Sequence, residues 1–198
     1  GYWQNVSYIQ GIRELLLKEF SFKTPLPAYC KEVFDEIEKS NSVCVVFRRG
    51  DYVGHPELDI MSMNYYYRAV EFFENRHEYM KYFVFSDDIP WCSHNFKPRN
   101  IEVKFVDQRF TGLKAEYYLQ LMIACKKYII PNSTYPWWAA WLNNDINKII
   151  NAKGCQRAVI ISYFSKSLIS EEELKKYRCE FCSNCVSDLN FKHNRAVI

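Results

Sequence analysis

Short apolar runs recur along this chain, and stretches with helical spacing separate most of them. The runs are at residues 43–47, 82–85, 103–106, 128–130 and 158–161, with a weaker one at 148–150. Helical patterns begin at Asn64, Lys114 and Pro136, and two more, at 8–19 and 27–39, precede the first run. Strands that alternate with helices form parallel sheets covered by helices on both faces. The sequence therefore predicts an α/β fold with a mostly parallel, doubly wound, Rossmann-like sheet.

The alternation stops after Lys153, where the chain becomes polar, as in SKSLISEEELKKY. We divide the sequence into a helical lead-in segment at 1–42, an α/β domain at 43–152 and a divergent C-terminal appendage at 153–198. A chain of 198 residues, 48% of them hydrophobic, can bury one good core but is too short for two full-sized domains.

Charge and cysteine content restrict the partners and the compartment. The formal net charge is +3, which gives no electrostatic reason to expect nucleic acid as a partner. No stretch approaches the roughly 20 apolar residues of a membrane-spanning helix, and the first residues lack a signal-peptide pattern. Four cysteines lie in apolar or helical settings, which favours reduced core thiols over a disulfide framework. They are Cys30, Cys44, Cys92 and Cys125. We expect a cytoplasmic protein, or one peripheral to a membrane.

Three cysteines near the end of the chain have the spacing of a partial zinc or cluster site. They are Cys179, Cys182 and Cys185, and a fourth ligand would have to be Cys155 or His193. Reduced or loosely paired thiols are the interpretation we prefer. We therefore expect no metal and no cofactor.

Polar residues directly follow four of the predicted strands. Ligands of open parallel sheets bind beyond the carboxyl ends of the strands, where the loops converge. The residues at these ends are Arg48, Arg49, Gly50 and Asp51, then Ser86, Asp87 and Asp88, then Asp107, and finally Asn132, Ser133 and Thr134. Polar residues often follow strands simply because loops are exposed to solvent, but four such groups at one edge of the sheet favour a polar cleft. A cleft with a positive pair, carboxylates and hydroxyls suits a small phosphorylated ligand.

The arginine pair carries the clearest chemical signal at this edge. Guanidinium groups offer planar forks of donors that match phosphate oxygens, and Gly50 lets the backbone turn sharply beside a ligand. Asp51 would either orient an arginine or serve only as a turn cap or salt-bridge partner. Asp87 and Asp88 would accept hydrogen bonds from a guanine edge or from sugar hydroxyls.

The segment after the fourth run allows two interpretations. Ser133 and Thr134 precede a helix with Pro136 in its first turn, so they either cap that helix or help its N-terminus to bind an anion. Trp137, Trp138 and Trp141 would stack on a sugar or, as we prefer, pack in the core. The P-loop pattern and the G-x-G-x-x-G turn are both missing, which argues against a P-loop kinase or a dehydrogenase.

Several segments together resemble GDP-fucose-dependent α-1,2-fucosyltransferases, glycosyltransferase family 11. They are FRRGDY at 47–52, YYYRAVEFF at 65–73, FVFSDDIPW at 83–91, VKFVD at 103–107 and NSTYPWWAAWLN at 132–143, preceded by GYWQN at 1–5. The resemblance implies the nucleotide-binding half of a GT-B-type glycosyltransferase. It also implies an inverting, metal-independent transfer of L-fucose from GDP-fucose to the 2-hydroxyl of a terminal galactoside, so the partners are GDP-fucose and a glycan acceptor.

The resemblance also assigns roles to the residues at the strand ends. It makes Arg48 the main diphosphate contact with Arg49 in support. The turn Ser86, Asp87 and Asp88 would hold the nucleoside, and Asn132, Ser133 and Thr134 would cap the phosphates. We take Arg48 and Asp51 as the candidate catalytic residues.

Departures from the family pattern support an alternative function. Val46 stands where the family usually has a histidine, and Pro136 replaces a serine with a residue that has neither hydroxyl nor N–H to offer a phosphate. The glycine-rich strand and turn of the acceptor-binding half are absent from this sequence, and the tail after Lys153 does not match. The alternative is a catalytically inactive GDP- or carbohydrate-binding module derived from such an enzyme. A purely structural domain is a weaker third option.

Overall fold

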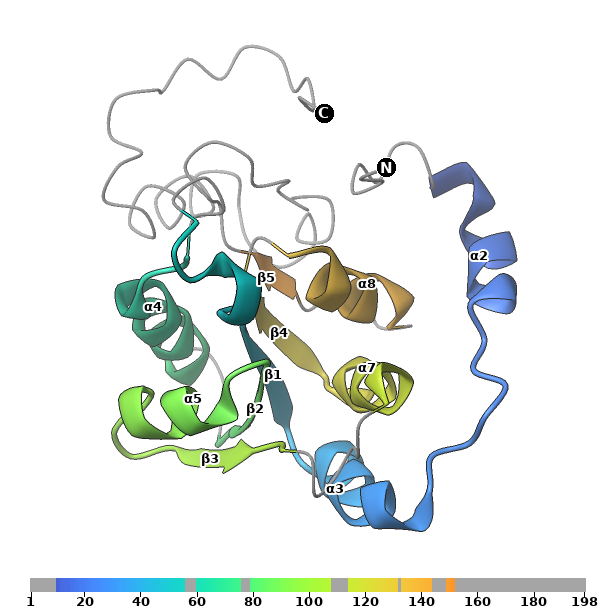
Figure 1. The fold of residues 1–198 in the computed structure, drawn as a ribbon. Coiled ribbons are helices and arrows are strands. Elements are labelled where there is room, and N and C mark those ends of the chain that lie inside the picture. Colours follow the sequence, from blue (N-terminus) through green and yellow to red (C-terminus); the bar gives the residue numbers. More distant parts are fainter. Residues whose placement is uncertain are drawn as a thin grey trace.

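A computed structural model gives the structure of the chain, and it describes residues 10–55, 60–75, 79–107, 114–131, 133–143 and 149–151. This part of the chain is built around a five-stranded, wholly parallel sheet (Figure 1). The strands lie in the order β3-β2-β1-β4-β5. Their bounds are β1 (Ser42–Phe47), β2 (Lys81–Ser86), β3 (Glu102–Phe105), β4 (Lys127–Ile130) and β5 (Ile149–Asn151).

Strand β1 is at the centre of the sheet. It pairs with β2 from Ser42 opposite Lys81 to Phe47 opposite Ser86, and with β4 on its other side. All the residues of β1 are buried, which explains why its sequence is a continuous apolar run rather than an alternation. Because the strands are parallel, the carboxyl ends of β2, β1 and β4 lie next to one another at one edge.

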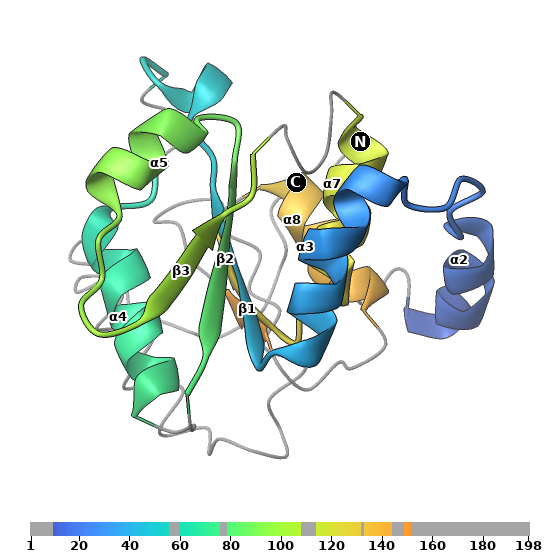
Figure 2. The same cartoon turned by 90° about the horizontal axis from the view of Figure 1, so that it is seen from below.

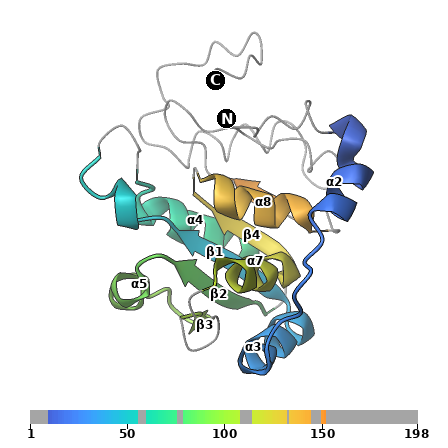
Figure 3. The same ribbon diagram turned by 45° about the vertical axis from the view of Figure 1, so that its right-hand side comes forward.

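Helices cover both faces of the sheet (Figures 2 and 3). Helices α4 (Met63–Glu74) and α5 (Ile89–Asn95) pack on one face, and α3 (Ala28–Lys39), α7 (Ala115–Ala124) and α8 (Thr134–Leu142) pack on the other. Successive side chains of β1 point to opposite faces. Val45 therefore belongs to the core under α4 and α5, whereas Cys44 belongs to the core under α3, α7 and α8.

Residues 10–19 of the lead-in segment lie on the outer side of α8 (Figure 1). They form the turn η1 (Gln10–Ile12) and α2 (Arg13–Glu19), whose residues are not buried. Arg13 Nη1 donates a hydrogen bond to the carbonyl of Trp141 at 2.9 Å, and the guanidinium lies 4.6 Å from the Trp141 ring centroid. An arginine stacked on an aromatic face thus attaches α2 to α8.

The predicted fold class is confirmed, and the five described strands lie close to their expected positions. Helix α5 is the main element that the periodicity does not predict. It spans seven residues, which is too short for a clear apolar stripe, but Asp88 at its N-cap and Pro90 in its first turn are start signals. The apolar run at 158–161 and the predicted appendage lie outside the described residues, and the domain boundaries stay predictions.

Two further expectations concern cysteines and membranes. Cys30, Cys44, Cys92 and Cys125 are free and buried, as predicted. The three tail cysteines lie outside the described residues. Within the described ranges, no helix has both the length and the apolar character needed to cross a membrane.

Candidate functional site

The carboxyl ends of β1 and β2 bring the arginine pair and the aspartate pair together. Arg48 Nη1 donates to Asp87 Oδ2, and the backbone N–H of Arg49 donates to Asp87 Oδ1 at 2.9 Å. Arg49 Nε lies 3.4 Å from Asp88 Oδ2. The two strands end in register, so the residues that follow them meet directly. The sequence prediction that these residues share one edge is therefore confirmed by their contacts.

A second carboxylate also contacts Arg48. Asp51, in the turn η2 (Gly50–Tyr52), lies with Oδ1 2.5 Å from Arg48 Nη2. The ring centroid of Tyr52 is 5.4 Å from the same guanidinium. Side-chain exposure is 35% for Arg48 and 63% for Asp51, so this ion pair is at the surface. The contact fits two of the roles considered for Asp51, orientation of an arginine and a simple salt bridge.

Gly50 allows a close approach between the turn and Asp87. A Cβ atom at residue 50 would lie 2.7 Å from Asp87 Oδ2 and 3.3 Å from its Cγ, closer than side chains tolerate. The space beside Gly50 was expected to accommodate a ligand. In this structure the carboxylate of Asp87 fills it.

Trp91 is a site residue to which the sequence analysis gave no role. Its ring centroid lies 3.5 Å from the guanidinium carbon of Arg49, and the Arg49 side chain is only 17% exposed. Contact with the face of an indole is a favourable cation–π arrangement. The feature of the sequence that pointed to Trp91 was its position shortly after the aspartate pair, at the start of a helix.

The turn after β2 is held by its own hydrogen bonds. Ser86 Oγ accepts a bond from the backbone N–H of Asp88 at 2.9 Å. Asp88 Oδ1 accepts a bond from the N–H of Trp91 at 3.1 Å, which makes Asp88 the N-cap of α5. The predicted nucleoside-binding residues therefore also fix the start of a helix.

Two tyrosines of α4 fix the ends of the neighbouring strands. Tyr66 donates from its hydroxyl to the carbonyl of Val46 at 3.0 Å, and Tyr65 donates to the carbonyl of Ile130 at 2.9 Å. Burial raises the pKa of both hydroxyls well above the usual value, so they stay protonated and keep donating. The motif YYYRAVEFF marked this helix, but the sequence did not indicate which carbonyls the hydroxyls reach.

The third predicted group follows β4, which neighbours β1 at the same edge. Asn132 lies outside the described residues. Ser133 is the N-cap residue of α8, but its hydroxyl makes no capping hydrogen bond, and Thr134 is the first residue of the helix. Among the described residues, no hydrogen bond or ion pair joins Ser133 or Thr134 to the arginines. The capping interpretation is thus correct for the position of Ser133 but not for its hydroxyl.

The aromatic residues of α8 behave as the sequence analysis preferred. Trp137 and Trp141 are 3% and 1% exposed and belong to the core, whereas Trp138 is partly buried against it. Their spacing on the helix therefore reflects packing, as predicted.

The electrostatic balance of the site differs from that of a bare cationic pocket. Two guanidinium groups face three carboxylates, those of Asp51, Asp87 and Asp88, so the cluster carries one net negative charge. Arg48 uses two of its five N–H groups in these contacts and Arg49 uses one side-chain N–H. Donors therefore remain for an anion, which must compete with the carboxylates that hold the guanidiniums.

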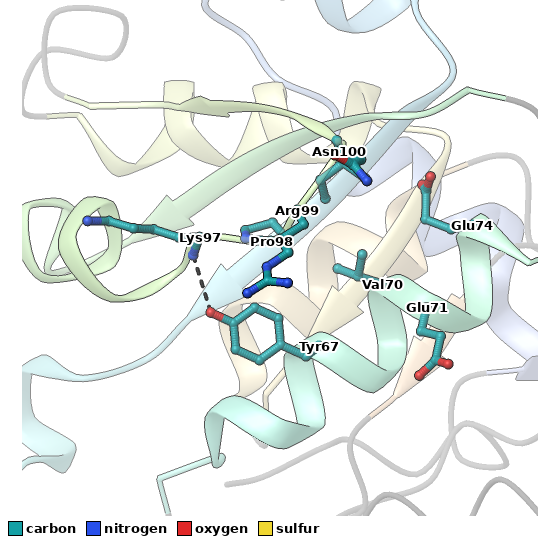
Figure 4. Close-up of a pocket in the computed structure, with 9 residues that line it drawn as sticks. Tyr67, Val70, Glu71, Glu74, Lys97, Pro98, Arg99 and Asn100 are labelled. Atoms are coloured by element: carbon teal, nitrogen blue, oxygen red, sulfur yellow. Dashed lines mark hydrogen bonds between the residues drawn. The ribbon is translucent and has the colours of Figure 1, made fainter.

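A separate groove lies away from these residues, between α4 and the loop before β3 (Figure 4). Its volume is about 600 Å³, and its lining includes Tyr67, Glu71 and residues 97–101. The hydroxyl of Tyr67 accepts a hydrogen bond from the backbone N–H of Lys97 at 3.3 Å. None of the predicted site residues lines this groove, so it is not the predicted cleft.

Comparison with known proteins gives consistent relatives. An α-1,2-colitosyltransferase of Escherichia coli is 37% identical over 153 residues, which cover 73% of this chain and 50% of that protein. The O-antigen biosynthesis glycosyltransferase WbnK of Escherichia coli is 30% identical over 159 residues, 75% of this chain and 51% of that protein. The galactoside 2-α-L-fucosyltransferase SEC1 of Bos taurus is 26% identical over 151 residues, 72% of this chain and 41% of that protein.

The chain spans about half the length of the curated relatives it matches. It has no significant match among solved structures. The sequence model of one family, described as glycosyl transferase family 11, matches residues 1–160 and so includes all the strand ends that form the candidate site. The chain therefore belongs to glycosyl transferase family 11.

Proposed function

We propose that this chain is the nucleotide-sugar-binding part of a GT-B-type glycosyltransferase that moves L-fucose from GDP-fucose to the 2-hydroxyl of a terminal galactoside. The observation that supports it most is the pair of arginines at the end of the central parallel strand, held by aspartates, in a member of this family. The names of the relatives include both fucosyl and colitosyl transfer. The identity of the donor sugar is therefore part of what must be tested.

The proposed binding mode uses the donors that the site leaves available. Arg48 directs its remaining N–H groups at the diphosphate, and Arg49, held against Trp91, adds a second charge. Ser133 supplies a hydroxyl at the N-terminus of α8, where the helix dipole favours an anion. Asp51 and Asp87 keep the guanidinium of Arg48 oriented toward the diphosphate.

The proposed chemistry follows from where charge develops. In an inverting transfer the acceptor oxygen attacks the anomeric carbon as the bond to GDP breaks, so negative charge grows on the departing phosphate. Fixed guanidinium donors lower the barrier because they interact more strongly with that charge than with the bound donor. In this proposal the arginines perform the role that a metal ion has in other transferases.

Titration with GDP tests the binding step. Replacement of Arg48 with alanine should weaken GDP binding by about 2 kcal/mol, roughly thirtyfold, as expected for a lost charged hydrogen bond. The control is Arg68→Ala, which removes the same charge from an exposed position on α4. Equal GDP affinity of the wild type and Arg48→Ala would contradict the proposed site.

An activity assay separates the enzyme from the alternative. The chain is incubated with GDP-fucose and lactose in the presence of EDTA, and fucosyllactose is sought by mass spectrometry, with a colitosyl donor in a parallel reaction. Product in EDTA supports a metal-independent transferase. Val46 and Pro136, which depart from the family pattern, favour the inactive GDP- or carbohydrate-binding module as second candidate. GDP binding without product from either donor would support that module.

We also propose a cytoplasmic location. The support is that Cys30, Cys44, Cys92 and Cys125 are free and buried, which fits a reducing compartment. Cell fractionation with immunodetection of the chain would test the location directly, and recovery outside the cytoplasmic fraction would contradict it.

A further inference from the structure

A tyrosine hydroxyl lies between two strands where a backbone hydrogen bond would be expected. Pairing of β2 with β3 continues one residue beyond β3, because Val106 N–H donates to the carbonyl of Val84 at 2.9 Å. In a regular parallel ladder the next bond runs from Ser86 N–H to the carbonyl of Val106. Here Ser86 N–H donates to the hydroxyl of Tyr118 at 2.7 Å, and that hydroxyl lies 3.0 Å from the carbonyl oxygen of Val106.

The chemistry of the hydroxyl suits this position. A tyrosine O–H has one proton to donate and lone pairs to accept with, so it satisfies Ser86 N–H and one carbonyl at the same time. The carbonyl oxygen of Ser86, at 3.2 Å, is a second acceptor for the same proton. Burial raises the pKa of Tyr118 well above the usual value, so the proton is retained. The ring packs edge-on against Phe85, with centroids 5.1 Å apart.

We propose that Tyr118 is a positioning residue for the site at the ends of β1 and β2. By occupying one ladder position, its hydroxyl separates the carboxyl ends of β2 and β3 and fixes where the chain leaves β2. Asp87 directly follows Ser86, and its carboxylate accepts hydrogen bonds from Arg48 Nη1 and from the backbone N–H of Arg49. The expected effect of Tyr118 on the affinity for GDP rests on the proposed function, whereas its effect on the position of the turn after β2 does not.

The variant Tyr118→Phe isolates the hydroxyl, because the ring and its packing on Phe85 remain. Ser86 N–H and the Val106 carbonyl can then approach each other and form the missing ladder bond, which closes the gap. Asp87 moves with the end of β2, and Arg49 N–H loses its acceptor. Binding sites tolerate displacements of only about 0.5 Å before ligand contacts weaken.

GDP titration measures the consequence for the ligand. We expect Tyr118→Phe to raise the dissociation constant about tenfold, the equivalent of one displaced hydrogen bond. The matched control is Tyr128→Phe, which removes a hydroxyl that donates to the carbonyl of Ile123 at 2.9 Å in the same core, away from the turn. The control should retain the wild-type affinity. Equal affinities of the wild type and Tyr118→Phe would overturn the positioning role and leave the proposed function intact.

Amide hydrogen exchange, read by NMR, tests the same inference without a ligand. In Tyr118→Phe the Arg49 amide should exchange about fivefold faster, because a hydrogen bond worth about 1 kcal/mol is lost. The amide of Val45, inside β1, should exchange as in the wild type. An unchanged Arg49 rate, or an equal increase at both amides, would overturn the inference. Failure of the wild type to bind GDP would contradict the proposed function, and exchange would still decide the role of Tyr118.

Discussion

Replacement of Gly50 with alanine tests whether Asp87 is fixed against the arginine turn. The new Cβ would lie 2.7 Å from Asp87 Oδ2 and 3.3 Å from its Cγ. Side chains do not tolerate such contacts, so the carboxylate must move. Gly50 is not among the described residues with positive φ, so the methyl group adds no backbone strain of its own. The cost of the variant therefore reports the loss of the contacts that Asp87 makes.

The expected magnitude follows from those contacts. The hydrogen bond from Arg49 N–H to Asp87 contributes about 1 kcal/mol to the free energy of unfolding. The ion pair with Arg48, whose side chain is 35% exposed, contributes about 0.5 kcal/mol because solvent screens it. Alanine recovers about 0.5 kcal/mol by restricting the unfolded chain. The net loss is about 1 kcal/mol, which lowers the thermal midpoint by about 4 °C.

A double-mutant cycle with Asp87→Ala gives the decisive comparison. Urea unfolding is measured for the wild type, both single variants and the double variant. Once Asp87 is truncated, Gly50→Ala should become neutral or stabilise by about 0.5 kcal/mol. Gly11→Ala serves as a control, since a Cβ there meets nothing within 4 Å. The same cost for Gly50→Ala in both backgrounds would refute the steric argument.

Two further predictions concern stability. Asp88→Ala should lower the free energy of unfolding by about 1 kcal/mol, because the N–H of Trp91 loses its cap; urea unfolding that shows no loss would contradict this. Burial alone would raise the pKa of Glu36, but hydrogen bonds from Lys104 and Lys81 bring it below the ordinary 4.5. The ionised Glu36 therefore contributes to the free energy of unfolding above pH 4.5, and this contribution is lost as the pH falls through the lowered pKa. Thermal midpoints between about pH 6 and pH 3 should therefore fall less steeply for Glu36→Gln than for the wild type, and equal slopes would refute the assignment.

Local sequence patterns were sufficient to predict the fold class and which residues lie at the carboxyl edge of the central strands. The burial of β1 follows from the apolar run at 43–47, and a parallel sheet follows from the helices between the runs. Arg48 and Arg49 come directly after that run, so they lie at the carboxyl end of the central strand β1. These features depend on neighbours in the sequence, which a reader of the sequence can see.

The contacts within the site depend instead on segments far apart in the chain. Arg48 and Asp87 are 39 residues apart, and Tyr118 and Ser86 are 32 residues apart. Only the register of β1 with β2, and the packing of α7 against the sheet, bring these groups within hydrogen-bond distance.

Tertiary structure also decided between alternatives that the sequence left open. The hydroxyl of Ser133 proved not to cap α8, and Trp137 and Trp141 proved to belong to the core. The residue types of a binding site can be recognised from a strand and the loop after it, because both are local. Which carboxylate holds which guanidinium is settled by angstrom-scale geometry, and that geometry exists only after the sheet and its helices have packed.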